Sequence, residues 1–269
     1  MSHSNTQKII EKWYLKLGFP KDYNVEFYKA LETYPISDTV TIDTYDLNCE
    51  DGKQNLLSFL FMCESLEELY RKHGIEENIL IDTLQDVVRY TKIWTEVKGT
   101  LYLGELMWLK RHFEGILFQL GRLQFCMAPA HRGIPEKGIS EGTPVLEIHI
   151  PDEGPLTPGA VDTSIAAART FFAAYFPAYS YQGITCHSWL LDPTLKEFLK
   201  PDSNILAFQN RFQTFFRMES DGLLRYLFKW DTTRTNLQDF QPTSGFAAKI
   251  KDSILSGKTF YTVTGLLAE

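Results

Sequence analysis

The hydrophobic pattern of this chain changes its period near residue 120, and this change limits the folds open to it. Before that point apolar residues recur every three or four positions, as Ile10, Trp13 and Leu17 do, which is the spacing of one helix face. From Arg122 to Met127 apolar and polar residues alternate, as in a strand with one buried face. Separate halves with different periods exclude a uniform helical bundle. We therefore predict an α+β protein whose C-terminal half has α/β character.

The first half predicts helices that end at glycines. The predicted helices cover residues 9–17, 25–34, 56–70, 79–97 and 101–120. Four of them are followed by Gly18, Gly74, Gly99 and Gly121, and glycine readily adopts the left-handed conformation that closes a helix. Residues 39–47 alternate weakly and predict a short strand. We expect an all-helical domain over 1–120 and a mixed domain over 121–269.

Residues 145–192 are the part of the second half that most suggests a ligand site. They predict a strand over 145–150, a Gly/Pro loop, a helix over 159–176 and a second strand over 184–191. Two parallel strands joined by a helix bring polar strand residues and a helix N-terminus to one end of a sheet, where an anion can bind. The remaining predicted elements are helices over 195–199, 205–212 and 246–255 and strands over 215–218, 223–230 and 260–266.

Net charge, the length of the apolar runs and the spacing of cysteine and histidine argue against several classes of binding partner. The net charge is −7, so nucleic acid is not an expected partner. The N-terminus has no apolar signal core and no run is long enough to span a bilayer, so we expect a cytoplasmic protein without a membrane partner. The four cysteines form no CxxC pair, and His112 and His131 have no companions at ligand spacing, so no metal is expected.

Five segments resemble a known family. They are GRLQF (121–125), LEIHIP (146–151), GPLTP (154–158), CHSWLLDP (186–193) and DSNILAFQNRF (202–212). Together they resemble a bacterial group of acyltransferases with a helical N-acyltransferase N-terminal domain and a GNAT-like C-terminal domain. No GxSxG, HExxH or P-loop motif offers another catalytic class.

The resemblance implies a site for acetyl-CoA or another acyl-CoA. The backbone of Ile148 and Ile150 would pair with the pantetheine arm, and the loop 154–160 would hold the pyrophosphate. The implied cofactor-binding residues of the loop and of the later helix are Gly154, Leu156, Thr157, Gly159, Ala160, Asn204 and Arg211. The loop departs from the family pattern, because Pro155 and Pro158 lack N–H groups and Asp152 and Glu153 are acidic.

Three residues are candidates for acid–base chemistry. Glu147 and His149 alternate onto one face of the predicted strand, and either could take a proton from an ammonium group. His187 could act as a base or as a polarising group, and a hydrogen-bonded structural histidine is the alternative. The family's usual tyrosine, which protonates the leaving thiolate, is missing from residues 193–214, and Tyr226 on a later predicted strand is the substitute. Cys186 as an acyl-carrying nucleophile is a weaker alternative, since buried cysteine is usually an apolar residue.

Further residues are candidates for binding the substrate. Arg122 and Gln124 share the polar face of the predicted strand that starts the second half, where an arginine fork could bind a carboxylate. Ser188, beside His187 but on the opposite face, completes the predicted set.

Our leading hypothesis is an acyl-CoA-dependent N-acyltransferase in which a small-molecule or peptide amine attacks the thioester directly. The helical half would cover one wall of the acceptor site. The alternative is a non-catalytic ligand-binding module on a GNAT-like frame with a degenerate phosphate loop. A structural or interaction protein, such as a homodimer, is the third hypothesis and rests only on acidity and aromatic content.

Overall fold

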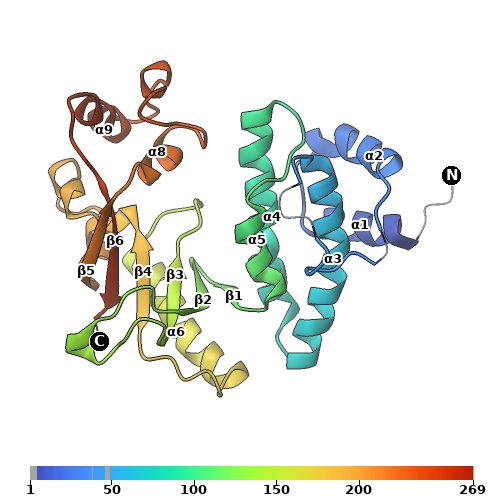
Figure 1. Ribbon diagram of the computed structural model, residues 1–269, viewed down its shortest axis with the longest axis horizontal. Helices are drawn as coiled ribbons and strands as arrows, with labels where there is room; N and C mark the ends of the chain where they lie inside the picture. Colours follow the sequence, from blue (N-terminus) through green and yellow to red (C-terminus); the bar gives the residue numbers. More distant parts are fainter. Residues whose placement is uncertain (1–4, 38, 46–48, 269) are drawn as a thin grey trace. The chain divides into compact units, whose positions relative to one another are not determined.

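A computed structural model describes residues 5–37, 39–45 and 49–268. It divides into two compact units, Met1–Gln119 and Leu120–Glu269. The first unit is helical and the second holds a mixed six-stranded sheet (Figure 1), so the predicted α+β fold class is confirmed. Among the described residues, no helix has the length and apolar character needed to cross a bilayer.

The helical unit is organised by capped helices. Its helices are α1 (Asn5–Lys16), α2 (Asn24–Thr33), α3 (Gly52–His73), α4 (Glu77–Lys98) and α5 (Leu106–Phe113). Helix α3 begins where Asp51 Oδ1 accepts a hydrogen bond from Lys53 N at 3.0 Å, which satisfies one free N–H of its first turn. It ends at Gly74, whose φ of 69° is left-handed. The glycine signals at Gly74 and Gly99 were therefore correct.

Two predictions in the first half are wrong. The helix expected over 101–120 is α5 followed by strand β1 (Leu117–Leu120), because Gly115 adopts a φ of 66° and breaks the chain between them. Gly121 lies in the turn after β1 rather than at a helix end. The strand expected over 39–47 is a set of turns over 39–45, and 46–48 lie outside the described residues.

The sheet has the strand order β1-β2-β3-β4-β6-β5. Its other strands are β2 (Leu123–Pro129), β3 (Pro144–His149), β4 (Ile184–Ser188), β5 (Phe212–Glu219) and β6 (Tyr261–Leu267). Strands β3 and β4 are parallel and are joined through helix α6 (Pro158–Tyr175), whereas the pairs β2–β3, β4–β6 and β5–β6 are antiparallel. The predicted strand–helix–strand unit is therefore present. Helix α6 starts as expected, with Thr157 as N-cap and Pro158 in its first turn.

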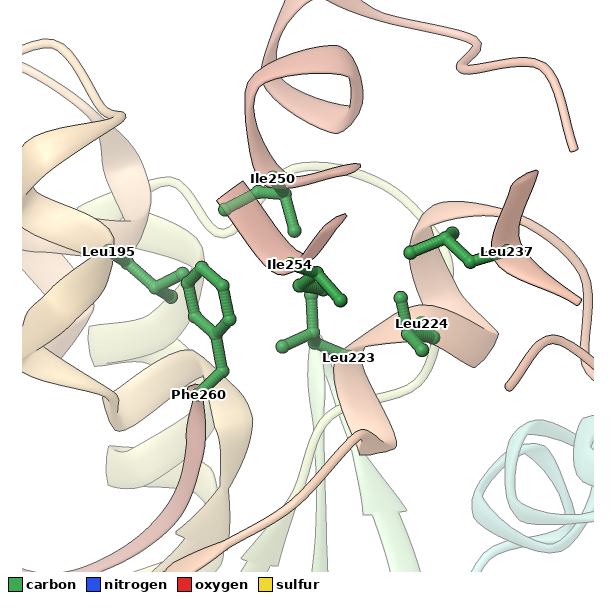
Figure 2. Packing of buried hydrophobic residues seen from close by; sticks show 7 residues of the cluster. All are labelled: Leu195, Leu223, Leu224, Leu237, Ile250, Ile254 and Phe260. Atoms are coloured by element: carbon green, nitrogen blue, oxygen red, sulfur yellow. The ribbon is translucent and has the colours of Figure 1, made fainter. Parts of the chain in front are cut away.

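The segment between β5 and β6 forms a small helical layer with its own core. It contains α8 (Gly222–Leu227) and α9 (Gly245–Leu255). Figure 2 shows how their apolar side chains meet those of neighbouring segments; the cluster is Leu195, Leu223, Leu224, Leu237, Ile250, Ile254 and Phe260. The strand predicted over 223–230 is wrong, because adjacent Leu223 and Leu224 are both buried, which a helix allows and a half-exposed strand does not.

The connections after β4 are shorter than predicted. Strand β4 ends at Ser188, and a 3₁₀ turn over Trp189–Leu191 follows it. A second 3₁₀ segment (Pro193–Glu197) stands near the helix expected over 195–199, and helix α7 (Asn204–Gln209) is shorter than the helix expected over 205–212. Helix α7 packs against α6, which brings the residues after β4 close to the helix that begins at the predicted phosphate loop.

Candidate active site

One face of the sheet carries the predicted acid–base residues. In the strand register Glu147 lies opposite Thr185 of β4, and His187 lies opposite Thr264 of β6. Residues in register project to the same face, and so do residues two apart along a strand. Glu147, His149, His187 and Thr264 therefore share one face of three neighbouring strands. This face is polar because Glu147 and His149 alternate with apolar residues along β3, as the sequence predicted.

Glu147 is a buried carboxylate between two histidines of unequal exposure. Only 5% of the residue is exposed. Its Oε2 lies 3.4 Å from His149 Nε2 and 3.8 Å from His131 Nε2. The side chain of His131, from the loop after β2, is 62% exposed. The carboxylate is thus shielded from solvent, while the exposed His131 connects it to the surface.

His187 is held from the side of β6. Its Nδ1 lies 2.7 Å from Thr264 Oγ1, which is hydrogen-bonding distance. Burial lowers the pKa of His187 below its ordinary value; Glu147 acts against this shift, and His131 and His149 add to it. The imidazole is therefore neutral at neutral pH, the form that can either accept or donate one proton.

Strands β3 and β4 stop pairing at the level of these side chains. Their register runs from Leu146–Ile184 to Ile148–Cys186, although β3 continues to His149 and β4 to Ser188. Leu146 N donates to Gly183 O at 3.0 Å, so by alternation the backbone of Ile148 and Ile150 also points toward β4. Ile148 lies within the ladder, whereas Ile150 lies beyond it. Of the two predicted pantetheine-binding residues, Ile150 is the one whose backbone lies beyond the β3–β4 ladder, where a ligand can pair with it.

The predicted phosphate loop is flanked by two arginines. Arg122 Nη2 donates to Gly154 O at 3.0 Å, and its Nε donates to Pro155 O at 3.4 Å. Arg211 Nη2 donates to Pro158 O at 3.2 Å, and the same guanidinium forms an ion pair with Asp162. Both positive charges lie beside the loop, where they offset its acidic residues.

The loop keeps fewer backbone donors than predicted. Ala160 N donates to Thr157 Oγ1 at 3.4 Å, so the helix cap uses this group. In the described part of the chain the N–H groups of Leu156, Thr157 and Gly159 donate to no protein acceptor. Burial raises the pKa of Asp152, while Arg122 opposes this shift. Three N–H groups at a helix N-terminus and two nearby guanidiniums form an arrangement that suits an anion.

Several predicted site residues lie away from the polar face of the sheet or have other partners. Arg122 lies in the turn before β2 and contacts the loop, not the polar strand face. Ser188 Oγ accepts a hydrogen bond from Leu190 N at 3.1 Å and so caps the following turn. Tyr226 is on helix α8 instead of a strand, and its ring lies 5.9 Å from that of Trp189. Its predicted role as a proton donor stays a prediction.

The other two predicted binding residues have clear positions. Gln124 is buried and lies opposite His149 in the β2–β3 register, so it belongs to the polar face. Asn204 is the first residue of α7, after its N-cap Ser203. The alternative nucleophile Cys186 is fully buried among apolar residues, and burial raises the pKa of its thiol, which disfavours the reactive thiolate.

The sequence did not reveal two residues that contact the predicted acid–base residues. His131 lies in a loop whose path over the polar face no periodicity predicts. Thr264 lies on the last predicted strand, but only the strand order places β6 beside β4. Thr262, Thr264 and Leu266 are two positions apart, so the sequence predicts that they share one face of their strand. It does not predict which strand lies beside them.

Family models agree with this fold. A GNAT-like C-terminal domain matches residues 117–267, and an N-acyltransferase N-terminal domain matches residues 27–115. The first match alone covers more than half of the chain. The chain therefore belongs to the N-acyltransferase family that combines these two domains.

Solved structures with the same fold are acyltransferases. One, an acyltransferase in complex with decanoyl-CoA, is 23% identical with a TM-score of 0.78 over 96% of this chain and 86% of its own. An acyltransferase in complex with decanoyl-CoA and teicoplanin is 23% identical with a TM-score of 0.80 over 96% of this chain and 87% of its own. A mutant acyltransferase in complex with octanoyl-CoA is 22% identical with a TM-score of 0.80 over 97% and 87%. The comparison with curated proteins finds no match.

Proposed function

We propose that this protein is an acyl-CoA-dependent N-acyltransferase that acylates the amine of a small molecule or peptide. The observation that carries the proposal is the position of Glu147, His149 and His187 on one sheet face, at the level where β3 and β4 stop pairing. Family membership supports it, and so do the solved relatives, which hold decanoyl-CoA or octanoyl-CoA.

The acyl-CoA would bind along the end of β3 and the loop after it. The backbone of Ile150, beyond the β3–β4 ladder, can pair with an amide of the pantetheine arm. The N–H groups of Leu156, Thr157 and Gly159 can bind the pyrophosphate at the start of α6. Arg122 and Arg211 lie close enough to the loop to add positive charge. Bound in this way, the thioester would lie near the polar side chains of β3 and β4.

The reaction needs one base and one group that stabilises the thioester oxygen. The acceptor enters as an ammonium group, and Glu147, with His149 beside it, takes its first proton. The free amine attacks the carbonyl carbon, an N–C bond forms, and the oxygen becomes negative. The C–S bond then breaks, the second amine proton passes to the thiolate sulfur directly or through solvent, and an amide and free CoA leave. His187, on the neighbouring strand, faces the same region as a polarising group.

The acceptor is proposed from the chemistry of the site and from one relative. A carboxylate with histidines favours a cation, which fits a protonated amine. The relative that is solved with teicoplanin holds an acceptor of peptide type. We therefore propose amine-bearing peptides, including glycopeptides, as the first acceptors to examine.

Two measurements test the proposal in order. The protein should melt at a higher temperature with octanoyl-CoA or decanoyl-CoA, since a ligand at 100 times its Kd adds about 2.7 kcal/mol of stability. Release of free thiol from the same esters, followed across a panel of amines, should then show turnover. Melting curves that stay unchanged at millimolar acyl-CoA would contradict the proposal.

A non-catalytic binding module remains the second candidate, and the loop favours it. Pro155 and Pro158 offer no N–H group, and Asp152 and Glu153 bring negative charge to the place of the pyrophosphate. Tight acyl-CoA binding with no thiol release over the whole amine panel would favour this candidate.

A further inference from the structure

His187 and Thr264 form a hydrogen-bonded pair across two strands of the polar face. They are register partners in the antiparallel β4–β6 pair, and Nδ1 and Oγ1 are 2.7 Å apart. Thr264 is buried, and among the described residues its hydroxyl has no other hydrogen-bond partner. Because Nδ1 is bound on the β6 side, ring geometry puts Nε2 on the side of the imidazole that faces away from β6.

The direction of this hydrogen bond follows from the protons and acceptor atoms that the hydroxyl group and the imidazole each have. A hydroxyl group has one proton to donate, and a buried O–H without an acceptor costs about 1–3 kcal/mol. If Nδ1 carried the ring proton, it would donate to Oγ1 and leave the hydroxyl proton without a protein acceptor. If Thr264 donates to Nδ1 instead, both groups are satisfied. The neutral imidazole then carries its proton on Nε2.

We propose that Thr264 is a positioning residue that holds His187 as the Nε2–H tautomer, aimed at the thioester oxygen. This rests on the proposed function, and it settles which of the two roles left open for His187 applies. The Nε2–H group would donate a hydrogen bond to the oxygen as it becomes negative in the attack. His187 would not serve as the base, because its remaining lone pair is occupied by the Thr264 hydroxyl. The base is then Glu147 with His149.

The charged groups around His187 agree with a neutral donor. Glu147 and His149 face it from β3, and His131 faces it from the loop after β2. From β6 it meets Thr264, and from β5 the register partner of Thr264 is the uncharged Phe216. A neutral ring beside the buried Glu147 adds no positive charge that would oppose proton transfer from the ammonium group to this carboxylate.

The experiment combines a spectroscopic and a kinetic measurement on the full chain. Protonated and unprotonated ring nitrogens differ strongly in ¹⁵N chemical shift, so labelled histidine reports the tautomer, and His187→Gln assigns the signal. The variants are Thr264→Val, which keeps the shape but loses the hydroxyl, and Thr264→Ser, which restores it. Thr262→Val is the matched control, since Thr262 lies on the same face of β6 but opposite Met218.

We expect the Nε2–H tautomer in the wild type, Thr264→Ser and Thr262→Val, and a mixture of tautomers in Thr264→Val. The kcat of Thr264→Val should fall about tenfold with KM unchanged, while Thr264→Ser stays close to the wild type. An Nδ1–H tautomer in the wild type overturns the proposal, and so does a Thr264→Val protein with the wild-type tautomer and kcat. The tautomer is read without substrate, so this result does not depend on whether the protein acylates amines.

Discussion

Each unit of this protein buries a carboxylate beside histidine, and the two sites differ in how far their histidines are exposed to solvent. In the helical unit, Asp86 on α4 is 3% exposed and accepts hydrogen bonds from Arg89 Nε at 3.2 Å and from Trp108 Nε1 at 3.1 Å. His112 Nε2 lies 3.2 Å from its Oδ2. In the sheet unit, the histidine nitrogens lie 3.4 and 3.8 Å from Glu147 Oε2, and one of these histidines is exposed.

We propose that this difference separates a structural carboxylate from a catalytic one. Burial alone would raise the pKa of Asp86, but His112 and Arg89 lie so close that it falls well below its ordinary value. Asp86 is therefore charged at neutral pH and is a poor proton acceptor there. Glu147 lies 3.8 Å from the ring nitrogen of His131, whose side chain is 62% exposed, so its surroundings connect it to solvent. The same residue types thus stabilise one unit and could do chemistry in the other.

The largest expected effect comes from removing Asp86. Asp86→Ala removes the carboxylate that pairs with the buried Arg89, so we expect a loss of about 3–5 kcal/mol in the free energy of unfolding. Urea denaturation followed by circular dichroism measures it. Asp82→Ala, an exposed position one turn earlier on α4, is the control and should change stability by less than about 0.5 kcal/mol. Equal effects in both variants would remove the contrast between the two carboxylates.

The second effect is on catalysis and belongs to Glu147. Glu147→Gln keeps the shape of the side chain but cannot accept the ammonium proton, so kcat in the thiol-release assay should fall about 100-fold. The melting temperature should stay close to that of the wild type. Glu141→Gln in the exposed loop before β3 makes the same change elsewhere and should keep full activity. Full activity in both Glu147→Gln and His149→Ala would reject the base assignment.

A third effect tests the arginines at the phosphate loop. Arg122→Met should raise the Kd for acyl-CoA about tenfold, because one charge-assisted contact with phosphate contributes about 1–2 kcal/mol. Isothermal titration calorimetry measures the Kd. Arg169→Met, on the exposed side of α6, should leave it unchanged. If CoA binds equally well to all three proteins, the anion site lies elsewhere.

The smallest effect is the dependence of stability on pH, which should differ between the units. The pKa of Asp86 is lowered in the folded state, so its contribution is present above its unfolded value of about 3.9 and is lost as pH falls below it. The pKa of His187 is also lowered, so the unfolded chain binds more protons below about pH 6.5 and stability falls there as pH falls. Asp86→Asn should flatten the first dependence and His187→Gln the second, as measured by denaturation across pH. Unchanged pH curves in both variants would contradict these assignments.

Local patterns in the sequence were sufficient to predict the start or end of a helix where a capping residue marks it. Thr157 and Pro158 mark the start of α6, and Gly74 and Gly99 mark helix ends, because caps depend on neighbouring residues only. Alternation gave the shared face of Glu147 and His149 for the same reason. Local patterns failed at residues 223–227, where burial in the cluster of Figure 2 decides the conformation.

The sequence by itself determined the division into a helical and a mixed half, the β3–α6–β4 unit and the candidate residues on its strands. The tertiary structure decided which strands are neighbours, and with this the partners of each residue. Thr264 lies 77 positions from His187 and bonds it, and His131 reaches Glu147 from a loop. Periodicity reports which face a side chain occupies, whereas contacts between distant strands depend on the packing of the whole unit.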